Sequence, residues 1–175
     1  ADRAYCYTPH FGAIWYTAPF IAASIHELCE RMAPGFVQDV AGWLGLTSWG
    51  GNVIQVKKQR RSDEGLQRNI MGAVMGLHRG MRLLIVVDDD IDPSNVNDVI
   101  WSMCTRFDPR EDMEVLRGNW STHLDPMVYS HDDRRNARVV IDACTPWARK
   151  DTFPVVARSS RELDARIKAK WGDFL

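Results

Sequence analysis

The sequence predicts one α/β domain, a mostly parallel β-sheet with helices on both faces in three layers. Segments with a strand-like pattern alternate with segments whose apolar residues recur every three or four positions, an order typical of this class. Residues 82–87, RLLIVV, are apolar almost throughout, as expected for a strand covered on both faces. The 175 residues, 45% of them hydrophobic, are enough for one core without disulfide bonds or metals.

The elements of the first half follow from local patterns. Apolar residues at helical spacing run from 18 to 32, and Pro34 and Gly35 end this predicted helix. Residues 1–17, which precede it, are interpreted as an N-terminal linker or interface arm. The β-branched stretch at 51–59 predicts a strand. Ser62, Asp63 and Glu64 predict the cap of a helix that ends near Gly80.

The second half contains a helix and two further strands before a terminal helix. Ser94 predicts the cap of a helix that ends before Pro109. Residues 114–116 and 138–143 are strand candidates, and residues 159–175 contain a predicted C-terminal helix. The mixed segment 118–138 is long for a loop in a compact domain, and such loops are often functional.

Composition and charge restrict the function classes. The formal net charge of −1 predicts no general attraction to nucleic acid or to an anionic membrane. No apolar run approaches the ~18 residues that a membrane span needs, and the start has no secretory pattern. The widely spaced Cys6, Cys29, Cys104 and Cys144 match no zinc or redox motif, so we expect a cytoplasmic protein with free thiols. The basic stretch 57–61, KKQRR, is interpreted as a solvated turn rather than a phosphate or RNA patch.

Asp88 to Asp92 form an acidic cluster directly after the apolar strand. Carboxylates at this end of a strand stand where α/β sheets bind ligands, and they suit Mg²⁺. However, no phosphate-binding glycine loop accompanies them. They are equally explained as a solvated strand end that places negative charge before the next helix. The residues alone leave both interpretations open.

The segment 118–138 holds a second group of candidates. Five of its residues have side chains of the kinds that bind metals or act as acids and bases. They are His123, Asp125, His131, Asp132 and Asp133. Their spacing is irregular, so a solvated loop is the competing interpretation.

Ordered blocks of residues resemble the UbiD family of decarboxylases. Residues 85–115, IVVDDDIDPSNVNDVIWSMCTRFDPREDMEV, are similar to that family's C-terminal domain in the acidic turn 88–92, in the helix segment 97–101, and in Thr105, Arg106 and Pro109. The resemblance covers most of residues 53–143. The whole chain, 1–175, is therefore identified as a UbiD-like C-terminal α/β domain.

The resemblance implies a reversible, non-oxidative decarboxylase of aromatic or α,β-unsaturated acids. Such enzymes use prenylated FMN and a divalent metal, Mn or Mg, and form oligomers. Their Arg-Glu-Glu catalytic set and most cofactor ligands lie upstream, in a flavin-binding domain that has no counterpart in this sequence. The chain is thus expected to be the C-terminal part or small subunit that closes the active site of a flavin-binding partner, and to be inactive alone.

Four residues are site candidates through the resemblance. Arg79 lies in the neighbourhood of a basic residue that touches the cofactor phosphate in some members. Leu124 corresponds to an apolar pocket residue, with Trp120 and Thr122 nearby as substrate-binding residues. An aromatic residue is usual at the position of Thr122 in this family. This departure leaves the identity of the acid substrate open. No catalytic residue and no metal ligand are expected in this chain, and the aspartates at 88–92 become a structural turn or interdomain contact.

Two alternatives remain. The chain is an interaction or regulatory subunit that kept the fold without the chemistry, or it is a free-standing Mg²⁺-dependent phosphotransfer or hydrolase domain built on the aspartates.

Overall fold

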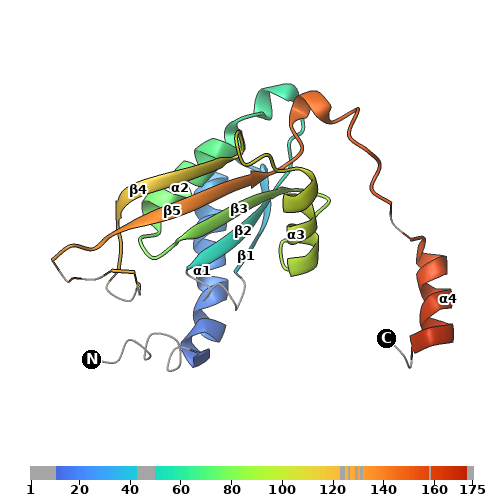
Figure 1. Cartoon of the computed structure of the whole chain (residues 1–175), viewed down its shortest axis with the longest axis horizontal. Helices are drawn as coiled ribbons and strands as arrows, with labels where there is room; N and C mark the ends of the chain where they lie inside the picture. Colours follow the sequence, from blue (N-terminus) through green and yellow to red (C-terminus); the bar gives the residue numbers. More distant parts are fainter. Residues whose placement is uncertain are drawn as a thin grey trace.

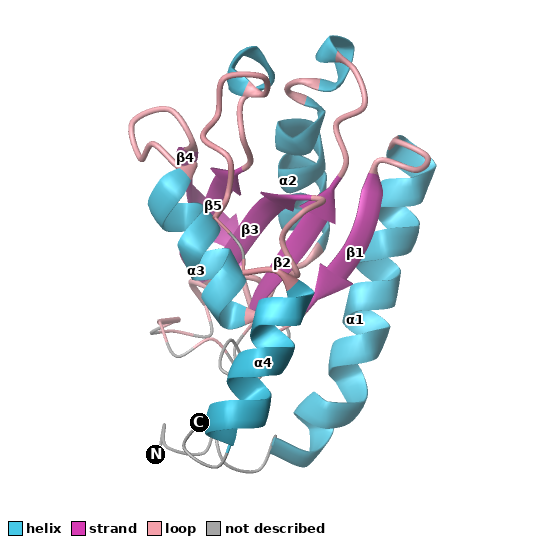
Figure 2. Cartoon of the chain, turned by 90° about the vertical axis from the view of Figure 1, so that its right-hand side faces the viewer, coloured by secondary structure: helices cyan, strands magenta, loops and turns pink. Residues whose placement is uncertain are grey.

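A single five-stranded β-sheet forms the centre of the computed structural model, which describes residues 11–42, 50–122, 125, 127–128, 130, 132–157 and 159–172. Helices lie on both faces of the sheet (Figure 1; Figure 2). In chain order the elements are α1 (Phe11–Met32), β1 (Val37–Ala41), β2 (Gly51–Val56), η3 (Arg61–Asp63), α2 (Leu66–Leu77), β3 (Leu83–Asp88), α3 (Val96–Thr105), β4 (Met113–Trp120), β5 (Arg135–Ala143), η4 (Trp147–Arg149) and α4 (Arg161–Trp171).

The sheet is mixed, with the strand order β1-β2-β3-β5-β4. The α/β class is confirmed, but "mostly parallel" overstates the sheet. The pairs β2–β3 and β3–β5 are parallel, whereas β1–β2 and β4–β5 are antiparallel. A parallel pair needs a long crossover, which α2 supplies between β2 and β3. The outer strands β1 and β4 each run antiparallel to the strand beside them, β2 and β5.

Both faces of the central strand β3 are buried, as the apolar run predicted. Leu84 and Val86 pack against α1 and α2, in a core that includes Ile25, Ile70 and other residues of these helices. Ile85 and Val87 point to the opposite face, where the core includes residues of α3. This alternation follows from the two-residue period of a strand, and it produces the three layers.

Both helix caps were predicted at the wrong residues. α2 begins after Gly65, whose φ of 92° is in the left-handed region that favours glycine. The carboxylates of Asp63 and Glu64 do not cap α2 because they accept hydrogen bonds from other groups, among them Gln59 N and Trp147 N. The cap of α3 is Asn95, one residue after the predicted Ser94, and its side chain accepts a hydrogen bond from Asn97 N.

The two terminal helices differ in their packing. α1 starts at Phe11, earlier than the predicted helix, so residues 11–17 of the expected arm are helical. α4 lies within the predicted range 159–175 and stands apart from the sheet (Figure 1). Every side chain of α4 that the structure describes is exposed. No helix in the described part of the chain has the length and apolar character to span a bilayer.

Candidate functional site

Arg138 is buried where β5 begins and β4 ends. Its Nη2 donates hydrogen bonds to the main-chain oxygens of Arg79, at 2.9 Å, and Trp120, at 2.6 Å. Its Nη1 donates to the main-chain oxygens of Met75 and of His78, the latter at 3.2 Å. One guanidinium therefore joins the end of α2, the turn before β3 and the end of β4.

The side chains of Arg79 and Trp120 meet on the surface above this buried group. The Arg79 guanidinium carbon lies 5.2 Å from the centre of the Trp120 ring, within the range of a cation–π contact. Trp120 is 57% exposed, and no acidic side chain among the described residues forms an ion pair with Arg79. We call this end of the sheet, with Arg79, Trp120, Ser121, Thr122 and Asp125, the Arg79 edge.

Asp125 is buried at the Arg79 edge and holds the segment after β4. It accepts hydrogen bonds from Ser121 Oγ at 3.1 Å, Asn136 Nδ2 at 2.9 Å and Met127 N at 3.0 Å, and it forms an ion pair with Arg82. Burial alone would raise the pKa of Asp125, but these hydrogen bonds and the Arg82 charge hold it below its ordinary value. Asp125 is thus an ionised anchor rather than a proton donor at neutral pH.

The remaining candidates of segment 118–138 differ in burial, and some lie outside the described residues. Thr122 is buried beside the anchor, whereas Leu124 lies outside the described residues, as do His123 and His131. Asp132 is exposed, and Asp133 pairs with Arg135, which lowers the pKa of Asp133 to about 2. Across the described residues, no three His, Cys, Asp or Glu side chains come together as a metal site requires.

The acidic cluster lies at the opposite end of the sheet and is bound to Arg106. Arg106 Nη1 lies 2.8 Å from Asp88 Oδ2, and Nη2 lies 2.7 Å from Asp90 Oδ2. Asp88 also accepts a hydrogen bond from Thr145 N at 2.7 Å, and Asp89 pairs with Lys57. Three of the aspartates are therefore engaged in ion pairs or hydrogen bonds within the chain.

A pocket of about 230 Å³ adjoins these aspartates where β2, β3 and β5 end, at what we call the Lys58 edge. Basic and acidic side chains face each other across it, so their charges largely cancel. Its lining residues are Lys58, Asp88, Asp89, Asp90, Arg106, Thr145, Lys150, Phe153, Pro154 and Val156.

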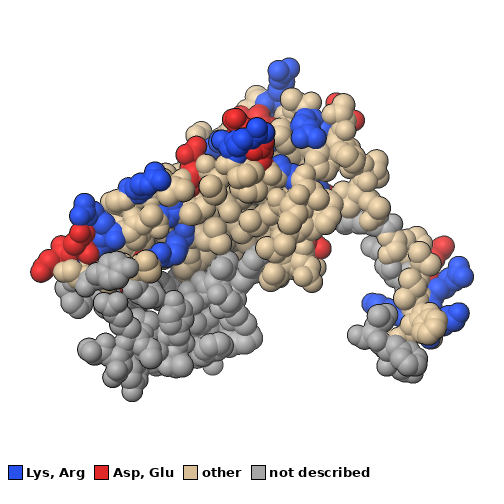
Figure 3. Space-filling view, in the orientation of Figure 1, with Lys and Arg blue, Asp and Glu red and all other residues tan. Residues whose placement is uncertain are grey.

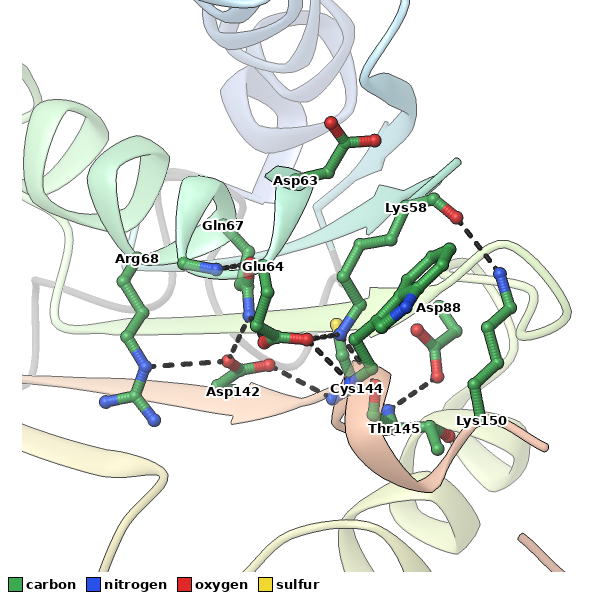
Figure 4. Close-up of polar contacts among 12 residues, drawn as sticks. Lys58, Asp63, Glu64, Gln67, Arg68, Asp88, Asp142, Cys144, Thr145 and Lys150 are labelled. Atoms are coloured by element: carbon green, nitrogen blue, oxygen red, sulfur yellow. Dashed lines mark hydrogen bonds and ion pairs between the residues drawn. The ribbon is translucent and has the colours of Figure 1, made fainter. Parts of the chain in front are cut away.

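Figure 4 shows how Lys58 and Asp142 are held at this edge. Lys58 Nζ donates to Thr145 O at 2.6 Å and to Glu64 Oε2 at 3.3 Å. Gln67 Nε2 lies 2.9 Å from both Glu64 Oε1 and Asp142 Oδ2. Burial raises the pKa of Asp142, and the Gln67 hydrogen bond opposes that shift. Lys58 is buried, so the solvated-turn interpretation of residues 57–61 was wrong at this position.

Several of these residues were not identified from the sequence. Asn136, Arg138 and Asp142 occupy alternate positions of β5 and point to the same buried face as Val140. Polar side chains on the same face as the apolar Val140 were the available signal, because a buried polar side chain must find partners in the core.

The described residues on one face of the molecule carry charges of both signs. In Figure 3, Lys and Arg side chains lie interspersed with Asp and Glu over the face that is shown. This distribution agrees with the formal net charge of −1.

Several curated relatives are decarboxylases. The chain is 34% identical over 141 residues to gallate decarboxylase of Lactiplantibacillus plantarum, covering 75% of this chain and 28% of that protein. It is 32% identical over 138 residues to anhydromevalonate phosphate decarboxylase of Archaeoglobus fulgidus, covering 79% of this chain and 29% of that protein. The chain thus spans less than a third of the length of these relatives.

Solved structures share the fold. The 3,4-dihydroxybenzoic acid decarboxylase of Enterobacter cloacae superposes with a TM-score of 0.75 at 25% identity, over 89% of this chain and 32% of that one. The UbiD-class enzyme HmfF of Pelotomaculum thermopropionicum, solved in complex with FMN, gives 0.75 at 23% identity, over 93% and 34%. The model of the 3-octaprenyl-4-hydroxybenzoate carboxy-lyase C-terminal domain matches residues 14–143. That match spans most of the chain, and the chain therefore belongs to this family, the UbiD family that its motifs resemble.

Proposed function

We propose that this chain is the part of a reversible, non-oxidative decarboxylase that closes the active site of a flavin-binding domain or subunit. The substrates are aromatic or α,β-unsaturated carboxylic acids, and the cofactor is prenylated FMN with a divalent metal, Mn or Mg, bound mainly outside this chain. The observation that carries the proposal is the pairing of Arg79 with Trp120, which presents a cation and an aromatic ring side by side on the surface.

Arg79 suits the phosphate of a flavin nucleotide. Its guanidinium is exposed, and the described residues provide no carboxylate that neutralises it. A guanidinium binds phosphate oxygens through two parallel N–H donors. The Trp120 ring restricts where this group can lie, and Arg79 can therefore orient the cofactor from the C-terminal side.

Trp120, Thr122 and Leu124 are the proposed substrate-binding residues. A half-exposed indole ring offers apolar area to an aromatic or unsaturated acid and excludes water from it. Thr122 lies two residues further along the chain and is buried in this structure. Contacts of this kind distinguish substrates by only ~1–3 kcal/mol. These residues should therefore alter the choice of acid more than they alter binding of the cofactor.

No acid–base set is assigned to this chain. The cofactor, when bound, supplies the electron-accepting centre for loss of CO₂, and the flavin-binding partner supplies the catalytic carboxylate and cation. Asp125 is held ionised by its hydrogen bonds and serves as an anchor. We therefore propose that the chain is inactive alone and acts within an oligomeric, cytoplasmic enzyme. Cys29 and Cys144 are free thiols within the core, as a reducing compartment permits.

The test is reconstitution of this chain with a UbiD-family flavin-binding domain, followed by CO₂ release over a panel of acids. We expect turnover from the complex and none from the chain alone. Arg79→Ala should weaken cofactor retention, whereas Arg110→Ala, at the Lys58 edge, should not. Trp120→Ala and Leu124→Ala should change the preference among acids, with Trp147→Ala as the matched control at the Lys58 edge.

Two results would refute the proposal. Turnover by the chain alone would place the chemistry inside it. A complex that forms but turns over at the same rate and with the same selectivity in all variants would favour the interaction or regulatory subunit.

A further inference from the structure

Arg138 is the feature of the Arg79 edge that the proposed function leaves unused. We propose that Arg138 is a positioning residue, whose buried guanidinium fixes the Arg79 turn relative to Trp120 and so sets both cofactor affinity and substrate selectivity. This inference rests on the roles proposed above for Arg79 and Trp120. Arg138 acts on both residues through their main-chain oxygens.

The hydrogen bonds of Arg138 use its full donor capacity. A guanidinium has five N–H donors in a rigid plane. The main-chain oxygens described above take up Nη1 and Nη2, and Nε lies 3.3 Å from Asn136 Oδ1. Burial lowers the pKa of Arg138, and the nearby charge of Asp125 opposes that shift. Neutral oxygens rather than a carboxylate therefore surround this cation. Arg138 thus acts as a clamp that holds several main-chain segments together.

The end of α2 explains why a cation is stable there. The last carbonyl groups of a helix lack partners within the helix and carry the negative end of its dipole. Met75 lies in the last turn of α2, and its oxygen is bound by Arg138, while Val74 O accepts from His78 N. Arg138 thus ends α2 and directs the chain into the turn that carries Arg79.

Arg138 also joins two segments directly, the turn before β3 and the end of β4, which otherwise meet through the Arg82–Asp125 ion pair and the Arg79–Trp120 contact. Trp120 is held by its pairing with Arg135 in the β4–β5 ladder. The turn with Arg79 is held to α2 and, through Arg82 N, to Gly50 O. Arg138 donates to both segments from the same nitrogen, Nη2. In each of Arg79 and Trp120, the main-chain oxygen and the side chain belong to the same residue and move together. A shift of the Arg138 guanidinium therefore moves the Arg79 cation relative to the Trp120 ring.

The experiment compares Arg138→Lys with Arg106→Lys in the reconstituted enzyme. Both substitutions keep the charge of a buried arginine and remove its planar fork, but Arg106 lies at the Lys58 edge. Both variants should lose stability to urea. We expect Arg138→Lys alone to weaken FMN binding about 10- to 100-fold, the scale of an ångström-sized misplacement. It should also change the ratio of kcat/KM between two acids. FMN fluorescence titration gives the affinity without turnover.

A double substitution distinguishes positioning from a general loss of structure. If Arg138 acts through Arg79, then Arg138→Lys should have little further effect on FMN affinity once Arg79→Ala is present. Additive losses, or equal losses in Arg138→Lys and Arg106→Lys, would overturn the inference. If Arg79→Ala and Trp120→Ala have no effect themselves, the proposed site is wrong instead. The two failures are therefore distinguishable.

Discussion

Arg106 is the cation that pairs with two aspartates of the acidic turn after β3. Its side chain is 3% exposed and binds Asp88 and Asp90. Arg106→Ala leaves both carboxylates without their cation, and we expect the free energy of unfolding to fall by about 3 kcal/mol. The lower end of the usual range applies because Asp90 is partly exposed. Urea denaturation of the isolated chain measures this change.

Arg110→Ala is the matched control for that measurement. Arg110 also pairs with an aspartate, Asp108, but its side chain is 83% exposed. An exposed ion pair contributes little because water solvates both charges, and no measurable loss is expected. Equal losses in the two variants would mean that the turn does not depend on Arg106.

A family motif was enough to predict some residues of the candidate site. It did not predict which side chains these residues contact. Arg106 was recognised as part of a family motif, but the motif does not say that it binds Asp88 and Asp90. The sequence neighbours of Arg79 likewise do not predict that it lies over Trp120. That contact depends on β5 standing between β3 and β4, and this order is not encoded in any local pattern.

At the scale of the elements, β4 contains an irregular step that depends on one glycine. The register between β4 and β5 shifts between Leu116 and Asn119, and Gly118 has a φ of 73° there. A side chain at this φ is strained even though the space that its Cβ would occupy is open. Gly118→Ala should therefore lower the free energy of unfolding by about 1 kcal/mol, as measured by urea denaturation.

Gly72→Ala in α2 tests the same exchange where the backbone is helical. The space that a Cβ would occupy at Gly72 is open as well. Alanine favours a helix interior by about 1 kcal/mol over glycine, and a gain in stability is expected. A loss at both glycines would show that crowding rather than φ decides the effect.

Helices and strands whose apolar residues recur at regular spacing were predicted, and those with irregular spacing were missed. The predicted helices and central strands appear because each has one clear apolar face or two. β1 was not predicted, since its sequence VQDVA places two polar residues between its apolar ones. The sequence of an edge strand of this kind resembles that of a loop. Only its pairing with β2 identifies it as a strand. The capping errors have a similar origin, because Asp63 and Glu64 have partners elsewhere.

For the whole molecule, the order of helices and strands was enough to predict the class but not the directions of all strands. Parallel pairs were expected wherever a helix lay between two strands, and β2 and β3 follow that rule. The outer strands β1 and β4 do not, because each pairs antiparallel with its neighbour. A sheet that is parallel at its centre and antiparallel at its edges therefore looks more parallel in sequence than it is.

The separation of α4 from the sheet divides the chain into two units of local stability. α4 has 11 residues, and an isolated helix of that length is marginal in water. Amide hydrogens in the sheet and α2 should exchange only on global unfolding, whereas those of Arg161–Trp171 should exchange close to the unprotected rate. Hydrogen-exchange mass spectrometry of the isolated chain measures both, and slow exchange in α4 would contradict this expectation. Its apolar residues Leu163, Ile167 and Trp171 recur every four positions, so the persistence of this helix depends on contacts from outside the sheet.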